Sequence, residues 1–399
     1  MVVPSAGADM ETTGAFRGLI CTACGAATDS TADRCPDCGG VLVGDYDGPD
    51  LTPADLPDTS GPGRYEPLRP FPQDATVTLG EGATPMVPVP DLADELGVDS
   101  VYVKDEGRNP TASLDDRKLS LSVTAAAQRG AERVVTSSTG NGAQANAAYA
   151  ARAGIESKGF VPSRCPFLNK AMVNVHGGDM RVVEGRYDDA VSAFDDEVAE
   201  AADGWVPVAP GHPFRIEGAK SVAFETADDL DWTAPDAVVH PTGHGETLVG
   251  LEHGFRAAAD SGLTDSTPRI YAAQPDSTAA VADAAREGAS EPAAIEHPDT
   301  IVGPLEVPDP AAGAAALDSL DRSGGNGVAV SDKDILAGAV DGCEMGPETG
   351  ATGGTAIAGA RALAEEGAFD DTDVVVLVNP VAGSKEADLL RSHLMSQGI

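Results

Sequence analysis

The sequence predicts an α/β protein with parallel sheets flanked by helices, preceded by a small zinc-binding ribbon. Two observations support this fold class. From about residue 73 onward, short β-branched runs alternate with alanine-rich amphipathic runs, which is typical of repeated strand–helix units. Before residue 50, four cysteines are arranged in two pairs whose spacing is typical of structural zinc sites.

The charge of the chain is strongly one-sided. Of its 399 residues, 64 are Asp or Glu and 26 are Lys or Arg, which gives a formal net charge of -38 spread along the whole length. Such a surface repels nucleic acid and anionic membranes, so neither is expected as a partner. A salt-rich cytoplasm accounts best for the excess, because salt screens the repulsion while hydrated carboxylates keep the protein soluble. We therefore expect a halophilic, cytoplasmic protein without a signal peptide or a membrane span.

The amino-terminal part separates by composition into two segments. Residues 1–50 are rich in Cys, Gly and Asp and contain the ribbon, and residues 51–72 are rich in Pro and Asp and are predicted to form an extended linker. The ribbon cysteines form two CxxC pairs, each followed by glycine, and four thiolates at this spacing can close a tetrahedral site. The alternatives are a disulfide or accidental cysteines, and Cys165 and Cys343 are expected to be packing residues. The expected zinc ligands are Cys21, Cys24, Cys35 and Cys38.

Five strand–helix units account for much of the chain after the linker. The strands are expected at 133–136, 158–161, 180–183, 237–239 and 374–377, and the helices at 143–153, 168–175, 187–202, 248–259 and 386–395. In parallel sheets, ligands bind in the turns that follow the carboxyl ends of the strands. The turns of interest are therefore 136–143, 241–247 and 379–385.

A series of motifs occurs in a fixed order from residue 103 onward. They are 104–114 (KDEGRNPTASL) followed by 115–117 (DDR), then 137–143 (SSTGNGA), 214–220 (FRIEGAK), 241–243 (PTG), and Asn379 with 383–385 (GSK). With these motifs and the ribbon, the chain resembles haloarchaeal threonine synthases, which belong to the fold type II family of pyridoxal-phosphate (PLP) enzymes. The resemblance covers essentially the whole chain. It implies a two-domain architecture in which 73–112 and 206–399 form a large α/β domain and 113–205 a small one.

The resemblance also implies a reaction and its cofactor. Enzymes of this family are lyases that convert O-phosphohomoserine and water into threonine and phosphate, with PLP attached to a lysine as an imine. In this chain Asp115 stands at the position of that lysine, and a carboxylate cannot form an imine. Lys118 lies about one helical turn further on and is the alternative amine, although reaching the lysine position requires a shift of about 5 Å. Otherwise Lys118 is expected to be a solvated helix residue paired with a nearby acid.

Two further cofactor anchors implied by the resemblance are altered. The expected phosphate cradle retains Gly243 and Gly245, but His244 adds bulk there and Glu246 adds negative charge in the first helical turn. Alternatively, both side chains point outward and the turn still binds phosphate. At the position of the hydroxyl that would contact the ring nitrogen, the sequence has Pro380, which has neither a hydroxyl nor an N–H, and Ser384 is displaced along the loop.

The substrate-side loop keeps its residue types, and Asn141 within it is the expected contact of the cofactor ring. The loop can hold a carboxylate or another small anion, with Arg164 and Lys170 as possible basic contributors or ordinary surface charges. The expected substrate-binding residues are Ser137, Ser138, Thr139 and Gly140. Asp115, His244 and Glu246 would form a new metal or acid–base site if the fold brought them together. His212 and His253 are expected to be surface or packing residues.

Two functional hypotheses follow. In the first, the chain is a pseudoenzyme of the threonine synthase type that has lost covalent PLP attachment and binds a small anionic or amino-acid-like ligand, or acts as a regulatory subunit. In the second, it is an active threonine synthase or related PLP lyase with unusual cofactor anchoring. We expect either a homodimer or a heterodimer with a catalytic homologue.

Overall fold

The computed structural model describes residues 10–48, 50–201, 204–396 and 398, and it consists of two compact units. Unit 1 comprises residues 1–81 and 115–221, and unit 2 comprises residues 82–114 and 222–399. The division that the sequence suggested differs at its boundaries, because it assigned 73–81 and 206–221 to the larger domain. Residues 206–221 belong to unit 1 because Phe214 packs there with Phe16 and Phe71 in the core beneath the ribbon.

Unit 1 contains a parallel four-stranded sheet in the order β8-β7-β6-β9. Its strands are β6 (Arg133–Ser137), β7 (Glu156–Pro162), β8 (Asp179–Val183) and β9 (Trp205–Pro207), and its helices are α2 (Asp115–Gln128), α3 (Asn141–Ala153), α4 (Phe167–Val175) and α5 (Tyr187–Ala199). Adjacent residues of a strand point to opposite faces. Val134 accordingly packs in the cluster formed with α2 and α3, and Val135 packs against Phe194 of α5. Both faces of the sheet are therefore covered.

The ribbon of unit 1 is a three-stranded antiparallel sheet in the order β2-β1-β3, with β1 at Phe16–Cys21, β2 at Ala27–Thr28 and β3 at Leu42–Tyr46. The proline-rich segment that follows was predicted to be an extended linker. Instead it contains the short 3-10 helices Pro53–Asp55 and Pro62–Leu68, and Phe71 at its end is fully buried. Proline fixes φ near -65°, which suits a 3-10 turn, and the apolar side chains have a core to enter.

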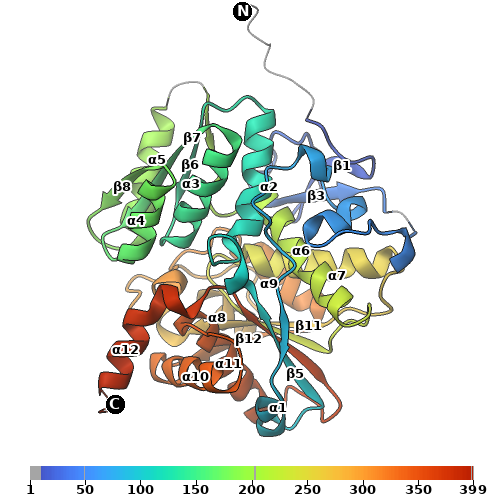
Figure 1. The fold of residues 1–399 in the computed structure, drawn as a ribbon, viewed down its shortest axis with the longest axis vertical. Helices are drawn as coiled ribbons and strands as arrows, with labels where there is room; N and C mark the ends of the chain where they lie inside the picture. The colour runs from blue at the N-terminus through green and yellow to red at the C-terminus, as the bar shows by residue number, and fades with distance from the viewer. Residues whose placement is uncertain (1–9, 49, 202–203, 397, 399) are drawn as a thin grey trace, which may run out of the picture. The chain divides into compact units, whose positions relative to one another are not determined.

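Unit 2 contains a six-stranded sheet in the order β12-β11-β10-β13-β5-β4. The strands are β4 (Met86–Pro88), β5 (Ser100–Asp105), β10 (Ala237–Pro241), β11 (Arg269–Pro275), β12 (Gly327–Val330) and β13 (Val374–Asn379). The edge strand β4 is antiparallel to β5, whereas the other pairs are parallel. Helices flank this sheet (Figure 1): α1 (Pro90–Leu96), α7 (Glu246–Asp260), α8 (Ala280–Glu287), α9 (Gly313–Ser323), α10 (Asp332–Met345), α11 (Ala351–Glu365) and α12 (Ala387–Ser396).

The five predicted strand–helix units are confirmed. Helix α7 begins two residues earlier than expected, at Glu246, because Gly245 adopts a left-handed conformation (φ +83°) from which the helix starts directly. Helix α6 (Pro213–Asp229) runs from unit 1 into unit 2, and the unit boundary falls after Ser221. Within the described residues, no helix combines the length and the apolarity needed to cross a bilayer.

Candidate functional site

Asp115 is the first residue of α2, and its carboxylate is held by two basic side chains of unit 1. Its Oδ1 atom lies 3.4 Å from Nη2 of Arg215 and 3.5 Å from Nζ of Lys118. The Arg215 side chain is 4% exposed, that of Lys118 12% and that of Asp115 19%. The expected pairing of Lys118 with a nearby acid is therefore confirmed, but the side chain is largely buried and not solvated. The acid is the residue at the expected lysine position.

The close packing of α6 against α2 allows this pairing. A Cβ atom added to Gly218 would lie 2.2 Å from the carbonyl oxygen of Arg117, so only glycine permits this approach of the two helices. Arg117 is itself buried, and its guanidinium donates to the hydroxyl of Ser221 at 3.0 Å. The FRIEGAK motif thus has a structural role, because its glycine brings α6 onto α2 and its arginine contacts the start of α2.

The serine-rich loop between β6 and α3 is buried and tightly folded. The Oγ atom of Ser138 accepts from the backbone N–H of Gly140 at 3.0 Å. Gly140 has φ +148°, and a Cβ there would lie 2.5 Å from Nδ2 of Asn169. That amide donates to Oδ1 of Asn141 at 3.0 Å, which fixes the side chain expected to contact a cofactor ring.

The loop lies close to Asp115. A Cβ atom added to Gly142 would be 3.8 Å from Oδ2 of Asp115, so the carboxylate faces the first turn of α3. The hydroxyl of Ser137 is 3.5 Å from that of Tyr187 on α5. Of the two expected basic contributors, Lys170 donates to the carbonyl of Ser163 at 3.0 Å, and Arg164 is exposed.

The glycine turn of unit 2 follows β10. The backbone carbonyl of His244 accepts from Ala312 at 2.9 Å, and its ring Nδ1 accepts from the N–H of Ala311 at 3.3 Å. A Cβ on Gly245 would lie 2.8 Å from Cβ of Ala316, so this glycine is required for packing on α9. The turn is therefore fixed to the segment that precedes α9.

Glu246 is the first residue of α7 and is 3% exposed. The alternative in which both altered side chains point outward is therefore wrong for Glu246. The buried Glu246 side chain therefore lies in the first turn of α7, where backbone donors would otherwise be open to an anion.

The segment after β13 has no hydroxyl at its first position. The carbonyl of Pro380 accepts from the N–H of Leu114 at 2.8 Å, and the amide of Asn379 donates to Asp105 at 2.9 Å. Burial raises the pKa of the Asp105 carboxyl above its ordinary value, although Asn379 donates to it. The backbone N–H of Ser384 donates to the carboxylate of Glu348, which was not among the expected site residues. Local sequence patterns contained no signal for Glu348, because it lies 36 residues from Ser384 along the chain.

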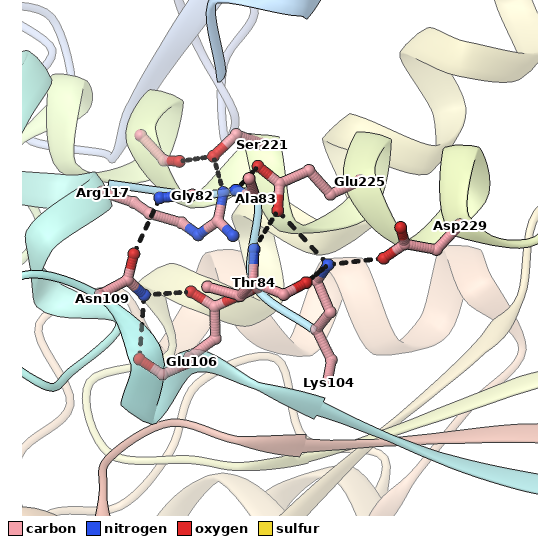
Figure 2. A network of polar contacts seen from close by, with 11 residues as sticks. Gly82, Ala83, Thr84, Lys104, Glu106, Asn109, Arg117, Ser221, Glu225 and Asp229 are labelled. Atoms are coloured by element: carbon pink, nitrogen blue, oxygen red, sulfur yellow. Dashed lines mark hydrogen bonds and ion pairs between the residues drawn. The ribbon is translucent and has the colours of Figure 1, made fainter. Parts of the chain in front are cut away.

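A second group missed at the sequence level is the buried amine of Lys104. Its Nζ atom donates to the carbonyl of Thr84 and to Asp229, both at 2.7 Å, and lies 3.3 Å from Glu225 (Figure 2). Glu225 also accepts from the backbone of Ala83 at 3.0 Å. The two acids are four residues apart on one helix face, which is the sequence signal that could have indicated a buried cation. Because it is paired with two acids, this lysine is not an available nucleophile.

The four ribbon cysteines form a compact group. Their Sγ atoms lie within 4.8 Å of one another, with separations of 3.5 Å from Cys21 to Cys38 and 3.7 Å from Cys24 to Cys35. Burial would raise the pKa of the Cys21 thiol, but hydrogen bonds from the backbone of Cys24 and Ala23 outweigh it and lower the pKa to about 7. The donor set and the spacing therefore fit a tetrahedral zinc ion.

The ribbon contacts α6 through a small charged group of unit 1. Glu217 accepts from the backbone of Gly44 at 2.8 Å and from the hydroxyl of Tyr46, and it pairs with Lys220 at 3.0 Å. The ammonium of Lys220 also lies 4.1 Å from the ring centroid of Tyr46. Burial and the Glu217 carboxylate raise the pKa of Tyr46 well above its ordinary value, so its hydroxyl remains a donor. His212 is a packing residue, as expected, and its ring is 3.4 Å from Asp33.

Comparison with known proteins identifies the class. Residues 77–380 match the family described as pyridoxal-phosphate dependent enzyme. Among solved structures, the chain is similar to maize serine racemase (TM-score 0.64, 19% identity, 79% of this chain and 94% of that one). It is also similar to threonine deaminase isoform 2 of Solanum lycopersicum (TM-score 0.66, 21% identity, 88% and 93%). The chain therefore belongs to the family of pyridoxal-phosphate-dependent enzymes, with the fold type II architecture.

Within that family, the similar curated proteins are threonine synthases. The chain is 32% identical over 372 residues to that of Methanosarcina acetivorans, covering 90% of each. It is 33% identical over 318 residues to that of Methanocaldococcus jannaschii, covering 78% of this chain and 77% of the relative. The chain is thus threonine synthase-like.

The described residues do not fit covalent attachment of the family's cofactor at the expected position. Asp115 has no amine, and its carboxylate is paired with Arg215 and Lys118. Asp115 and the serine-rich loop belong to unit 1, whereas Gly243, His244 and Glu246 belong to unit 2. The joint site of Asp115, His244 and Glu246 therefore remains a prediction.

Proposed function

We propose that this chain is a threonine synthase-like protein that has lost covalent PLP attachment and acts as a small-anion-binding or regulatory subunit. The observation that carries the proposal is the ion pairing of Asp115 with Arg215 and Lys118 at the start of α2. A carboxyl group in this place cannot form an imine, and Arg215 and Lys118 hold it there by ion pairing. The buried Glu246 at α7 supports the proposal independently, because its side chain lies where backbone donors would otherwise be open to a phosphate group.

One observation favours the alternative of an active enzyme. The Nζ atom of Lys118 is 3.5 Å from the carboxylate at the expected lysine position, so an amine is present close to it. If this amine replaced the missing lysine, the chain would be a threonine synthase or related PLP lyase with unusual anchoring. The ion pair opposes this, because Nζ of Lys118 is engaged with the Asp115 carboxylate and would have to leave it to form an imine.

The two functions can be separated by trapping. The protein is incubated with PLP in high salt, reduced with borohydride and examined by mass spectrometry for a modified lysine, with Lys118→Met as the test variant and Lys170→Met as the matched control. We expect no adduct on Lys118 and no release of phosphate from O-phosphohomoserine. An adduct that disappears only in Lys118→Met, together with phosphate release, would establish the active enzyme instead.

The reverse substitution at position 115 tests which sequence change prevents attachment of the cofactor. Asp115→Lys returns an amine to the start of α2, next to the serine-rich loop. An adduct at position 115 in this variant would show that Asp115 alone prevents attachment. Absence of the adduct would mean that the changes at Glu246 and Pro380 also prevent cofactor binding.

We further infer that the ribbon holds one structural zinc ion through its four cysteines, and that the protein functions in the cytoplasm. The proposed partner is a second copy of the chain or a catalytic homologue. Mass photometry of the protein alone and mixed with a threonine synthase of the same source would distinguish the two.

A further inference from the structure

One edge of unit 1 exposes several large apolar side chains. Of the seven such side chains that are exposed in the described residues, four lie on α4 and β8. They are Phe167, Leu168, Val175 and Val182, which are 83%, 44%, 71% and 46% exposed. Helix α4 links β7 to β8 and contacts β8, so we refer to these four side chains and strand β8 as the α4–β8 surface (Figure 1). A concentration of exposed apolar groups on a soluble protein indicates a site of association.

The charge of α4 differs from that of the chain as a whole. Residues 157–178, which include α4, contain no Asp or Glu, although 64 of the 399 residues of the chain are acidic. Two copies of a chain with a net charge of -38 repel each other, and this repulsion is weakest where carboxylates are absent. A second copy can therefore approach this surface more readily than a surface of average composition.

Strand β8 is at the edge of its sheet, whose order is β8-β7-β6-β9. The carbonyl of Val183 accepts from the N–H of Ser163, which follows β7, so the odd-numbered residues of β8 direct their backbone groups toward β7. Met180 and Val182 direct theirs outward, where another strand can pair with them. The outward N–H of Met180 donates to Oδ1 of the adjacent Asp179 at 2.8 Å. Backbone donors and acceptors thus lie beside the exposed apolar groups.

The charges of β8 favour one register for pairing with a second copy. A two-fold axis perpendicular to the sheet pairs the strand with itself in antiparallel fashion. With the axis at Met180, Asp179 lies opposite Arg181 of the second copy, and the same pair recurs on the other side of the axis. These side chains are 63% and 52% exposed, so both can reach across. With the axis at Arg181, two arginines would lie opposite each other, which is unfavourable.

We propose that the α4–β8 surface is a two-fold interface between two copies of this chain. The N–H and C=O of Met180 exchange hydrogen bonds with those of its counterpart, and the Asp179 carboxylate leaves this N–H for Arg181 of the second copy. The two sheets join along β8, and the two copies of α4 lie on the same face, where they cover Phe167 and Val175. Of the two partners proposed above, this interface takes the second copy, and it does not depend on the loss of PLP attachment.

A charge exchange between two variants tests the register. The full-length protein is studied by sedimentation velocity over a range of concentrations, at the lowest salt concentration at which it is folded. The parent should form a dimer. Asp179→Arg and Arg181→Asp each place like charges opposite each other at both contacts, and each should raise the Kd of the homodimer at least about tenfold. An equimolar mixture of the two variants restores opposite charges at both contacts and should form heterodimers with nearly the affinity of the parent. Weak association of the mixture, or undisturbed homodimers of both variants, would refute this register.

A second pair of variants tests the apolar part of the interface. Val175→Asp replaces an exposed apolar side chain of α4 by a charge and should raise the dimer Kd at least about tenfold. Met395→Asp is the matched control, because Met395 is 64% exposed but belongs to α12, and it should leave the Kd unchanged. A dimer that Val175→Asp leaves intact, or a parent chain that stays monomeric at every concentration, would overturn the proposal. Borohydride trapping of PLP on the same samples reports on the proposed function separately, because it does not require assembly.

Discussion

At the residue scale, Asp115 stabilises the fold of unit 1 through its contact with Arg215. The guanidinium is 4% exposed, and the carboxylate is one of its partners, at 3.4 Å. Asp115→Ala should lower the free energy of unfolding by about 1–3 kcal/mol, because it leaves a buried cation with one partner fewer. The measurement is chemical denaturation at constant salt. The control Asp47→Ala breaks an exposed pair with Arg17 and should leave stability unchanged, and equal effects of both variants would contradict the argument.

Gly218 provides a second prediction at this scale. In a solvent-exposed helix, replacing glycine by alanine stabilises by about 1 kcal/mol. Here the added Cβ would lie 2.2 Å from a backbone oxygen of α2, which cannot move without moving the helix. Gly218→Ala should therefore destabilise the protein by about 3 kcal/mol. Thermal or chemical unfolding measures this loss of stability. The control is Gly14→Ala, because a Cβ atom added there has nothing within 4 Å.

At the element scale, Glu386 caps the N-terminus of α11. Its carboxylate accepts from the backbone of Thr352 at 2.9 Å and from the same residue's hydroxyl. Burial raises the pKa of Glu386 above its ordinary value of 4.5 despite these hydrogen bonds. A raised pKa in the folded state means that this group contributes stability below pH 4.5 and that the contribution is lost as pH rises through the folded pKa.

The pH dependence of the stability of Glu386→Gln tests the direction of this pKa shift. The difference in unfolding free energy between variant and parent should change in favour of the variant as pH rises above 4.5. Denaturant titrations from acid to neutral pH measure the difference. Glu365→Gln, on the exposed end of the same helix, changes the net charge equally and serves as the control. Curves for Glu386→Gln and its parent that remain parallel would be inconsistent with the assignment.

The ribbon is the other element whose behaviour can be measured. With four cysteine Sγ atoms within 4.8 Å, we expect one zinc ion per chain, and Cys24→Ser should lose it and lower Tm. Elemental analysis and calorimetry provide the readouts, and Cys343→Ser should keep its zinc because it lies outside the cluster. A metal content of one zinc per chain would also rule out the site predicted from Asp115, His244 and Glu246. A second stoichiometric metal would support it.

At the scale of the whole molecule, the net charge of -38 makes stability depend on salt. Repulsion between carboxylates opposes the compact state, and the screening length falls from about 10 Å at 0.1 M to about 3 Å at 1 M salt. Tm should therefore rise over this range, and equally for NaCl and KCl at equal ionic strength. A constant Tm, or the same rise with a non-ionic osmolyte alone, would show that charge screening is not the cause.

Local pattern predicted much of this fold. The run from Arg133 to Thr136 followed by alanine-rich sequence was sufficient to indicate β6 and α3, because both periodicities are local. The CxxC pairs likewise indicated a compact thiol cluster. The boundaries of the units were not predictable, because α6 runs through one of them without any break in its helical pattern.

The partners of the site residues depend on distance in space and were missed for that reason. Asp115 and Arg215 are 100 residues apart, and Asn379 and Asp105 are 274 apart. The motifs predicted which positions belong to the site, but they did not predict which side chains contact one another there. The burial of Glu246 was equally hidden, because a glutamate in the first turn of a helix is ordinarily exposed.

The contact between the ribbon and α6 also sets an order of events during synthesis. Gly44 and Tyr46 are translated 173 and 171 residues before Glu217, to which they bind. At a synthesis rate of about 5–20 residues per second, Glu217 leaves the ribosome roughly 10–35 s after the ribbon does. During that interval Phe16 lacks its contact with Phe214, and Tyr46 lacks the carboxylate of Glu217. Early capture of zinc would keep the nascent ribbon in one conformation until α6 is made.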